Sequence, residues 1–237
     1  MVRNRTAFLI LLVTSYLSFL EVAAQAVWQI PKKPAAIQVD GFLQEWDAVA
    51  GITLQSGAPD VRSDSVTQAD DVSVVAKAAW DEDNLWIALE WKDNTWDVEQ
   101  VLRQQAVWVT PQQQRRERML FYDYLKVQMI DPEFDYLLWL SPRIENRGPF
   151  YWSRLLSGAK RMERATSPPA ISARQRGGAA TVEILLPWRE LHIKPKAGKS
   201  LPLSLVIADS DLPGKPLELK LSQLKSLVWD GAIRLVE

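Results

Sequence analysis

Short segments of alternating apolar and polar residues, separated by turn-forming residues, run through most of the chain beyond residue 26. The clearest example is a hairpin pattern, in which Val72–Trp80 and Leu85–Trp91 flank the acidic turn 81–84. Further strands are predicted at Ala36–Val39, Tyr124–Ile130, Tyr136–Leu140, Thr181–Leu186, Leu203–Ala208 and Ala232–Val236. Because no regular helical segment follows each strand, the pattern predicts an all-β protein, a β-sandwich of the immunoglobulin-like or jelly-roll type.

Two stretches lack this alternation. Residues 97–114 contain Gln, Arg and Val without a strict period, and they predict either a short helix or a long loop. Residues 158–178 are rich in Arg, Ala, Ser and Pro and contain almost no large apolar residue. This composition predicts an exposed, mobile connection between strands.

The N-terminus has the pattern of an export signal. Arg3 and Arg5 precede a hydrophobic run from Ala7 to Leu20, and small residues then lead to Ala24-Gln25-Ala26. This pattern is typical of a signal peptide that is cleaved after residue 26, and the run is short for a membrane span. We expect a signal peptide at 1–26, one β-sandwich domain at 27–237, and a secreted or periplasmic protein without membrane attachment after cleavage. An uncleaved membrane anchor is the alternative.

Composition excludes several functions. The chain has no cysteine, which rules out thiol catalysis, iron–sulfur clusters and cysteine-based zinc sites. A single histidine makes a Ser-His-Asp triad untenable, and no other catalytic set stands out, so we expect a non-catalytic protein. The net charge of −1 gives no reason to expect nucleic acid as a partner. Eleven tryptophans point instead to stacking surfaces or to a tryptophan-rich core.

Several motifs, taken in order, resemble the family 9 carbohydrate-binding modules and their DOMON-like relatives. They are an Asp-Gly turn followed by Glu-Trp, an acidic hairpin ending in aspartate, a central strand between aspartates, and a Pro-Trp turn followed by an acidic loop. These motifs occupy Ile37–Trp46, Ala78–Asp93, Tyr122–Asp131, Thr181–Leu191 and Ala208–Asp211. The resemblance covers nearly all of residues 36–237, and it implies a β-sandwich that binds carbohydrate.

In that family, two tryptophans clamp a terminal sugar, and one of them stands just before the aspartate that matches Asp123. The matching positions in this chain are Leu120 and Lys225, so the chain departs from the family at both. Aromatic rings stack on the C–H faces of sugars, and arginine donates paired hydrogen bonds. We therefore predict substitute ligand-binding residues near these positions and in the aromatic loop 146–154: Phe121, Tyr122, Asp123, Arg147, Tyr151, Trp152 and Trp229. For each aromatic residue, the alternative is that it fills the core or anchors a loop.

Carboxylates are frequent in the predicted turns. Calcium takes six to eight oxygen ligands, so these turns could hold calcium, although solvated turn residues are the simpler interpretation. The residues concerned are Asp81, Glu82, Asp83, Asp93, Asp209 and Asp211. No other cofactor is expected from the residues themselves.

Two alternative functions stay open. The segment Leu89–Thr95 is similar to a stretch of the haem b subunits associated with ethylbenzene dehydrogenase, in which a methionine and a lysine ligate the iron. This resemblance implies a periplasmic haem b protein that transfers electrons, with Met119, Met129 and Met162 as the methionines to consider, although methionine in a strand usually fills the core. The other alternative is a subunit that binds a protein partner and has lost the sugar clamp. Our first expectation is a secreted, non-catalytic carbohydrate-binding protein.

Overall fold

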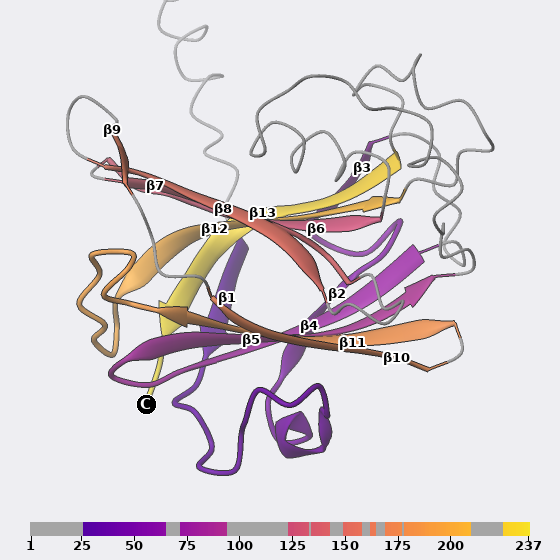
Figure 1. The fold of residues 1–237 in the computed structure, drawn as a ribbon, viewed down its shortest axis with the longest axis horizontal. Helices are drawn as coiled ribbons and strands as arrows, with labels where there is room; N and C mark the ends of the chain where they lie inside the picture. The colour runs from indigo at the N-terminus through magenta and orange to yellow at the C-terminus, as the bar shows by residue number, and fades with distance from the viewer. Residues whose placement is uncertain are drawn as a thin grey trace, which may run out of the picture.

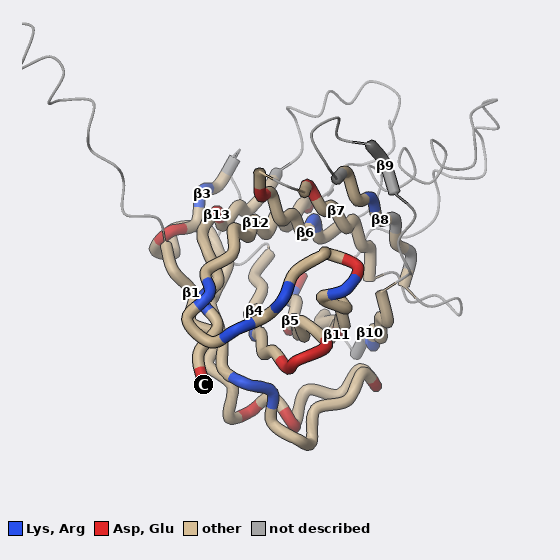
Figure 2. Tube along the Cα trace, turned by 90° about the vertical axis from the view of Figure 1, so that its left-hand side faces the viewer, with Lys and Arg blue, Asp and Glu red and all other residues tan. Residues whose placement is uncertain are grey.

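Two β-sheets packed face to face make up the structure, a computed structural model of the chain (Figure 1 and Figure 2). The described residues are 26–64, 72–93, 123–132, 134–142, 149–157, 162–164, 169–176, 178–209 and 225–237. Within them, no helix is long and apolar enough to cross a membrane.

The larger sheet has eight strands in the order β1-β13-β12-β6-β7-β8-β9, with β3 pairing with β13. The strands are β1 (Ala26–Ile30), β3 (Val61–Asp64), β6 (Tyr124–Ile130), β7 (Phe134–Ser141), β8 (Phe150–Ser157), β9 (Met162–Arg164), β12 (Ser200–Asp209) and β13 (Lys225–Leu235). Strand β1 runs parallel to β13, and the other pairs are antiparallel.

The smaller sheet has five antiparallel strands in the order β10-β11-β5-β4-β2. They are β2 (Gly51–Leu54), β4 (Val72–Trp80), β5 (Asn84–Asp93), β10 (Ala170–Arg176) and β11 (Ala179–Pro187), and a short 3-10 helix, η1, spans Gln44–Trp46. The prediction of an all-β sandwich is confirmed, and the hairpin pattern at 72–91 forms β4 and β5.

Two predictions of local structure are wrong. The stretch 158–178 is not only a connection, because it contains β9 and all of β10, an edge strand of the smaller sheet. The alternation of apolar and polar residues in β10 is weak, because small residues occupy several of its positions. Ile171 and Ala173 of this strand pack against the core. Residues 36–39 are irregular, with a turn at residue 36 and a bend at residue 39, and do not form the predicted strand. The stretch 97–114 lies outside the described residues.

The main core lies between the sheets and is made by alternate residues of their inner faces. On β6, for example, Leu125, Val127 and Met129 are fully buried, while Lys126 and Gln128 on the opposite face are only partly so. Burying one such apolar side chain contributes about 1.5–3 kcal/mol. Packing of this kind must hold the sandwich together, since the chain has no cysteine.

A second, smaller core lies on the outer face of the five-stranded sheet, under residues 36–50, which we call the strap (Figure 1). Ile37, Trp46 and Val49 of the strap pack there against Trp86 and Ala88 of β5. The strap explains the motif that begins with the Asp-Gly turn: it covers a sheet face that would otherwise expose apolar side chains.

One buried carboxylate on β11 fastens the strap. Glu183 Oε2 accepts hydrogen bonds from the backbone N–H groups of Asp40 (2.9 Å) and Gly41 (2.6 Å), and Oε1 accepts one from the indole N–H of Trp46 (2.7 Å). The side chain is 1% exposed. Burial raises the pKa of Glu183, while these three hydrogen bonds act on its pKa in the opposite direction.

Gly231 gives a first testable prediction. A Cβ at this position would lie 2.5 Å from Trp229 Cζ2 and 2.6 Å from the carbonyl oxygen of Ala26, so alanine would force apart β1, β13 and the Trp229 ring. We expect Gly231→Ala to lower the free energy of unfolding by about 1–3 kcal/mol in urea titrations. Gly178→Ala is the control, because the nearest atom there would lie at 3.3 Å. Equal stability of the two variants would contradict the prediction.

Candidate functional site

Several strand ends meet at one end of the sandwich, which we call the loop end. In the larger sheet, Asp209 at the end of β12 pairs with Lys225 at the start of β13, and Ala208 pairs with Tyr124 at the start of β6. In the smaller sheet, β5 ends at Asp93. The chain segments 94–122 and 210–224 therefore leave and re-enter the sandwich at this end.

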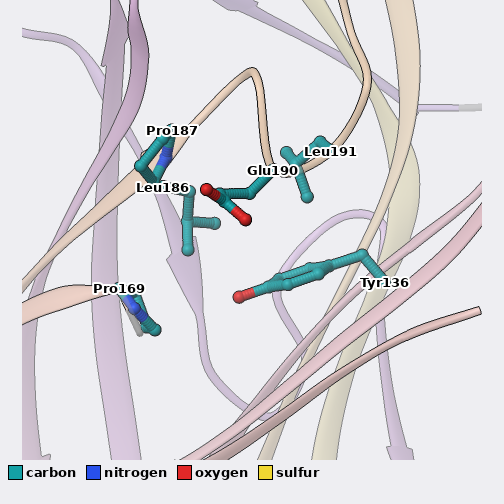
Figure 3. A pocket seen from close by; sticks show the side chains of 6 residues that line it. All are labelled: Tyr136, Pro169, Leu186, Pro187, Glu190 and Leu191. Carbon is teal, nitrogen blue, oxygen red and sulfur yellow. The ribbon is translucent and has the colours of Figure 1, made fainter. Parts of the chain in front are cut away.

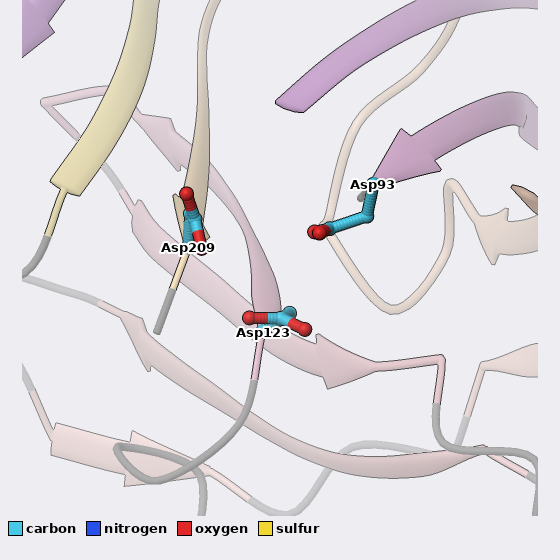
Figure 4. Close-up of side chains that lie close together, drawn as sticks. All are labelled: Asp93, Asp123 and Asp209. Carbon is cyan, nitrogen blue, oxygen red and sulfur yellow. The ribbon is translucent and has the colours of Figure 1, made fainter. Parts of the chain in front are cut away.

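Three buried aspartates form the base of the loop end (Figure 4). Asp93, Asp123 and Asp209 are 5%, 4% and 2% exposed, and one carboxylate oxygen from each lies within 4.8 Å of the others. Asp93 ends a strand of the smaller sheet, Asp209 ends a strand of the larger sheet, and Asp123 directly precedes β6. The aspartate cluster thus links the two sheets.

The donor set of this cluster fits a hard divalent cation. Carboxylate oxygens are preferred ligands of Ca²⁺, which takes six to eight oxygens, so water and backbone carbonyls would complete the shell. Three carboxylates this close also repel one another, and a cation relieves that repulsion. The backbone N–H of Asp93 donates to the carbonyl of Gly178 (3.1 Å), which fixes the end of β5. These residues could hold calcium.

The structure separates the described turn carboxylates into two groups, and Asp211 lies outside the described residues. Asp81 has a local role, because its Oδ1 accepts hydrogen bonds from the backbone N–H groups of Asp83 and Asn84 in the β4–β5 turn. The simpler interpretation, that these carboxylates are solvated turn residues, is wrong for Asp93 and Asp209, since both are buried beside Asp123. The sequence did not predict that these three residues lie together, although each stands at the end of a strand.

Two of the predicted ligand-binding residues pack with the core. Trp229 is 4% exposed and meets Trp28 edge-on, with the ring centroids 6.0 Å apart, so its ring offers no exposed face to a sugar. Tyr151 on β8 is partly buried against the same core. Asp123 lies in the aspartate cluster, and Tyr151 is near the same end of the sandwich, because it pairs with Leu140, which pairs with Leu125 near the start of β6.

The remaining predicted residues are described in part or not at all. Phe121, Tyr122 and Arg147 lie outside the described residues. Trp152 pairs with Trp139 across β8 and β7, but its side chain lies outside the described part. Of the methionines considered for haem, Met129 is fully buried in the core, and the side chains of Met119 and Met162 lie outside the described part.

An aromatic pair that the sequence did not reveal follows Asp123. The rings of Tyr124 and Trp139 stack on the outer face of the larger sheet, 5.2 Å apart and 2° from parallel. Both side chains are buried, and burial raises the pKa of Tyr124. The stack fixes the first residue of β6 next to the aspartate cluster.

A small pocket lies near Pro187, where β11 ends away from the loop end (Figure 3). The hydroxyl of Tyr136 points into it beside Pro169 and Leu186, and the carboxylate of Glu190 lies nearby. Burial raises the pKa of Tyr136, and the charge of Glu190 acts in the same direction. The cavity holds about 10 Å³, room for about one water molecule, so it is too small for a sugar.

No family model and no curated protein matches the chain, whereas solved structures with a similar fold were found. A carbohydrate-binding module of family 9 from Caldicellulosiruptor kristjanssonii, solved with cellotriose, superposes with a TM-score of 0.55 and 12% identity, over 89% of this chain and 94% of that chain. A family 9 module from the same organism, solved with glucose, superposes with a TM-score of 0.53 and 13% identity, over 87% of this chain and 95% of that chain. The chain shares the fold of these modules. At this identity, the similarity establishes the fold alone.

Proposed function

We propose that the protein is an exported, non-catalytic carbohydrate-binding protein that binds its sugar at the loop end. The observation that carries the proposal is the shared fold with family 9 modules whose structures contain cellotriose and glucose. The signal-peptide pattern at 1–26 supports export.

The arrangement of the strands supports the location. Binding residues of sandwich proteins commonly lie in connections that a rigid pair of sheets holds at one end. Here the long connections 94–122 and 210–224 both begin and end beside the aspartate cluster. A cation held by that cluster would fix the bases of these connections, and the sugar would bind above it.

The aspartate cluster lacks the geometry of a glycosidase active site. Glycosidases place two carboxyl groups about 5–5.5 Å or 6.5–9.5 Å apart across a cleft that admits the substrate. In the described part of the chain, the grouped carboxylates are those of the aspartate cluster, which are closer together and at most 5% exposed. A glycosidic bond could not reach these three buried carboxylates, so the aspartate cluster is not a hydrolytic pair.

Calorimetric titration of the purified protein with cellotriose and with glucose tests the proposal, with a glycan array to find the preferred sugar. We expect saturable binding with a Kd between about 1 μM and 1 mM, a change in tryptophan fluorescence and no release of reducing sugar. Absence of binding to every glycan at millimolar concentration would sink the proposal.

The same preparation separates the alternative functions. A haem b protein would show a Soret absorption band, and a subunit that has lost the sugar site would co-purify with a partner and bind no glycan. Either result would replace carbohydrate binding as the function.

A further inference from the structure

An exposed aromatic ring and an arginine lie stacked on the outside of the smaller sheet. Phe42 of the strap is 44% exposed, and the guanidinium carbon of Arg174 on β10 lies 3.7 Å from the centroid of its ring. Arg174 is also exposed. The two residues are 132 positions apart in the chain, so the fold has brought them together.

Several contacts hold Arg174 in this position. Its Nε donates a hydrogen bond to the carbonyl oxygen of Asp40 (2.8 Å). Its stem lies against Gly41, where a Cβ would approach Arg174 Cγ to 2.7 Å and where φ is +86°. The hydroxyl of Thr181 donates to the carbonyl of Gly41 (2.7 Å), which fixes the turn. The guanidinium is therefore positioned before any ligand arrives, which lowers the entropy cost of binding.

The charge of Arg174 has no carboxylate partner in the described part of the chain. The Oδ1 atom of Asp40 accepts the backbone N–H of Phe42, and both oxygens of Glu183 accept hydrogen bonds from the strap. Only Nε of the guanidinium is used in a hydrogen bond to the described residues, so its terminal N–H groups are available to a ligand.

We propose that Arg174 and Phe42 form a subsite for a carboxylate-bearing sugar, a uronic acid residue of an acidic glycan. The inference rests on the proposed carbohydrate-binding function. A guanidinium binds a carboxylate through two parallel hydrogen bonds, and the exposed part of the Phe42 ring packs against the apolar face of a pyranose.

The position of the subsite fits a longer ligand. Arg174 pairs with Thr181 on β11, two residues from Ala179, which pairs with Lys92 near the end of β5. Two residues of a strand span about 7 Å. The subsite thus lies on the outer face next to the loop end, within reach of an oligosaccharide that binds there.

The test compares an oligogalacturonide with cellotriose on the whole protein and on variants. For wild type, we expect the oligogalacturonide to bind more tightly than cellotriose, and we expect this preference to shrink as salt rises from about 20 to 200 mM. Arg174→Gln should weaken oligogalacturonide binding about tenfold or more, and Phe42→Ala should weaken it severalfold. Affinity for cellotriose should stay within about twofold in Arg174→Gln, because cellotriose carries no carboxylate. Arg189→Gln is the matched control, since that arginine is 80% exposed and pairs with Glu190.

The outcomes distinguish the subsite from the function on which it rests. Cellotriose binding without a preference for the oligogalacturonide, or with no effect of Arg174→Gln, would overturn the subsite and leave the proposed function standing. Failure to bind either sugar would overturn the subsite, and failure to bind every glycan of the array would overturn the proposed function as well. Because Arg174 also fastens the strap, Phe42→Ala is the second variant: it keeps the hydrogen bond to Asp40, and unchanged oligogalacturonide affinity in this variant would count against the subsite.

Discussion

Glu183→Gln should lower the free energy of unfolding by about 2–4 kcal/mol. The carboxylate accepts three hydrogen bonds in a buried position, and an amide offers one oxygen in place of two. If the amide oxygen faces the backbone N–H groups of Asp40 and Gly41, the amide NH₂ faces the indole N–H of Trp46, donor against donor. The reverse orientation places the NH₂ against two backbone donors.

A double-mutant cycle with Trp46→Phe tests whether the contact between two donors causes this loss of stability. Phenylalanine removes the indole N–H, so the amide of Glu183→Gln then meets no opposing donor on that side. The double variant should be more stable than the sum of the two single effects predicts, with a coupling energy of about 1–2 kcal/mol in urea titrations. Glu90→Gln on the neighbouring strand, an exposed glutamate, should change stability by no more than about 0.5 kcal/mol.

The loss of stability in Glu183→Gln should be concentrated in the strap. We expect Glu183→Gln to speed amide hydrogen exchange in residues 36–50, because these residues lose their fastening, while the inner strands β5 and β6 keep their protection. Exchange that rises equally throughout the chain, or strict additivity of the two substitutions, would contradict the account of Glu183 as the fastening of the strap.

Glu183 also shows where sequence reasoning stops. The strand predicted at Thr181–Leu186 is confirmed as part of β11, and Glu183 lies on its outer face, opposite the core residues Val182 and Ile184. The sequence does not show that this outer face is covered. Burial of Glu183 depends on the strap, whose Gly41 stands 142 residues earlier in the chain and which was predicted in part as a strand.

The aspartate cluster could not be predicted from the sequence for a similar reason. The alternation in β5, β6 and β12 predicts where each strand ends, but not which ends meet in space. The pairing of β12 with β6 brings Asp209 to Asp123, and the packing of the two sheets brings Asp93 to both. Local pattern thus predicts elements and faces well, whereas a site built from several strand ends depends on topology that no local pattern contains.

Calcium should raise the melting temperature of the protein by roughly 5–10 °C at a hundredfold excess over its Kd, since binding to the folded state alone contributes about 2.7 kcal/mol there. The physical reason is the aspartate cluster, in which three buried carboxylates within 4.8 Å of one another gain a shared counter-charge. Chelation with EDTA should reverse the increase. Magnesium should produce a smaller one, because it demands stricter octahedral geometry than three fixed carboxylates readily supply.

Substitution in the aspartate cluster tests whether calcium raises the melting temperature by binding there. Asp123→Asn should abolish most of the calcium-induced increase, because it removes a charge from the cluster and leaves the shape nearly unchanged. Asp230→Asn is the matched control: Asp230 is exposed, pairs with Arg62 and lies outside the cluster, so its calcium response should equal that of wild type. Terbium luminescence, sensitised by nearby tyrosine and tryptophan rings, measures occupancy without reference to stability. If millimolar calcium changes neither the melting temperature nor the terbium signal, the cluster does not bind calcium, and the two sheets meet at the loop end without a cation.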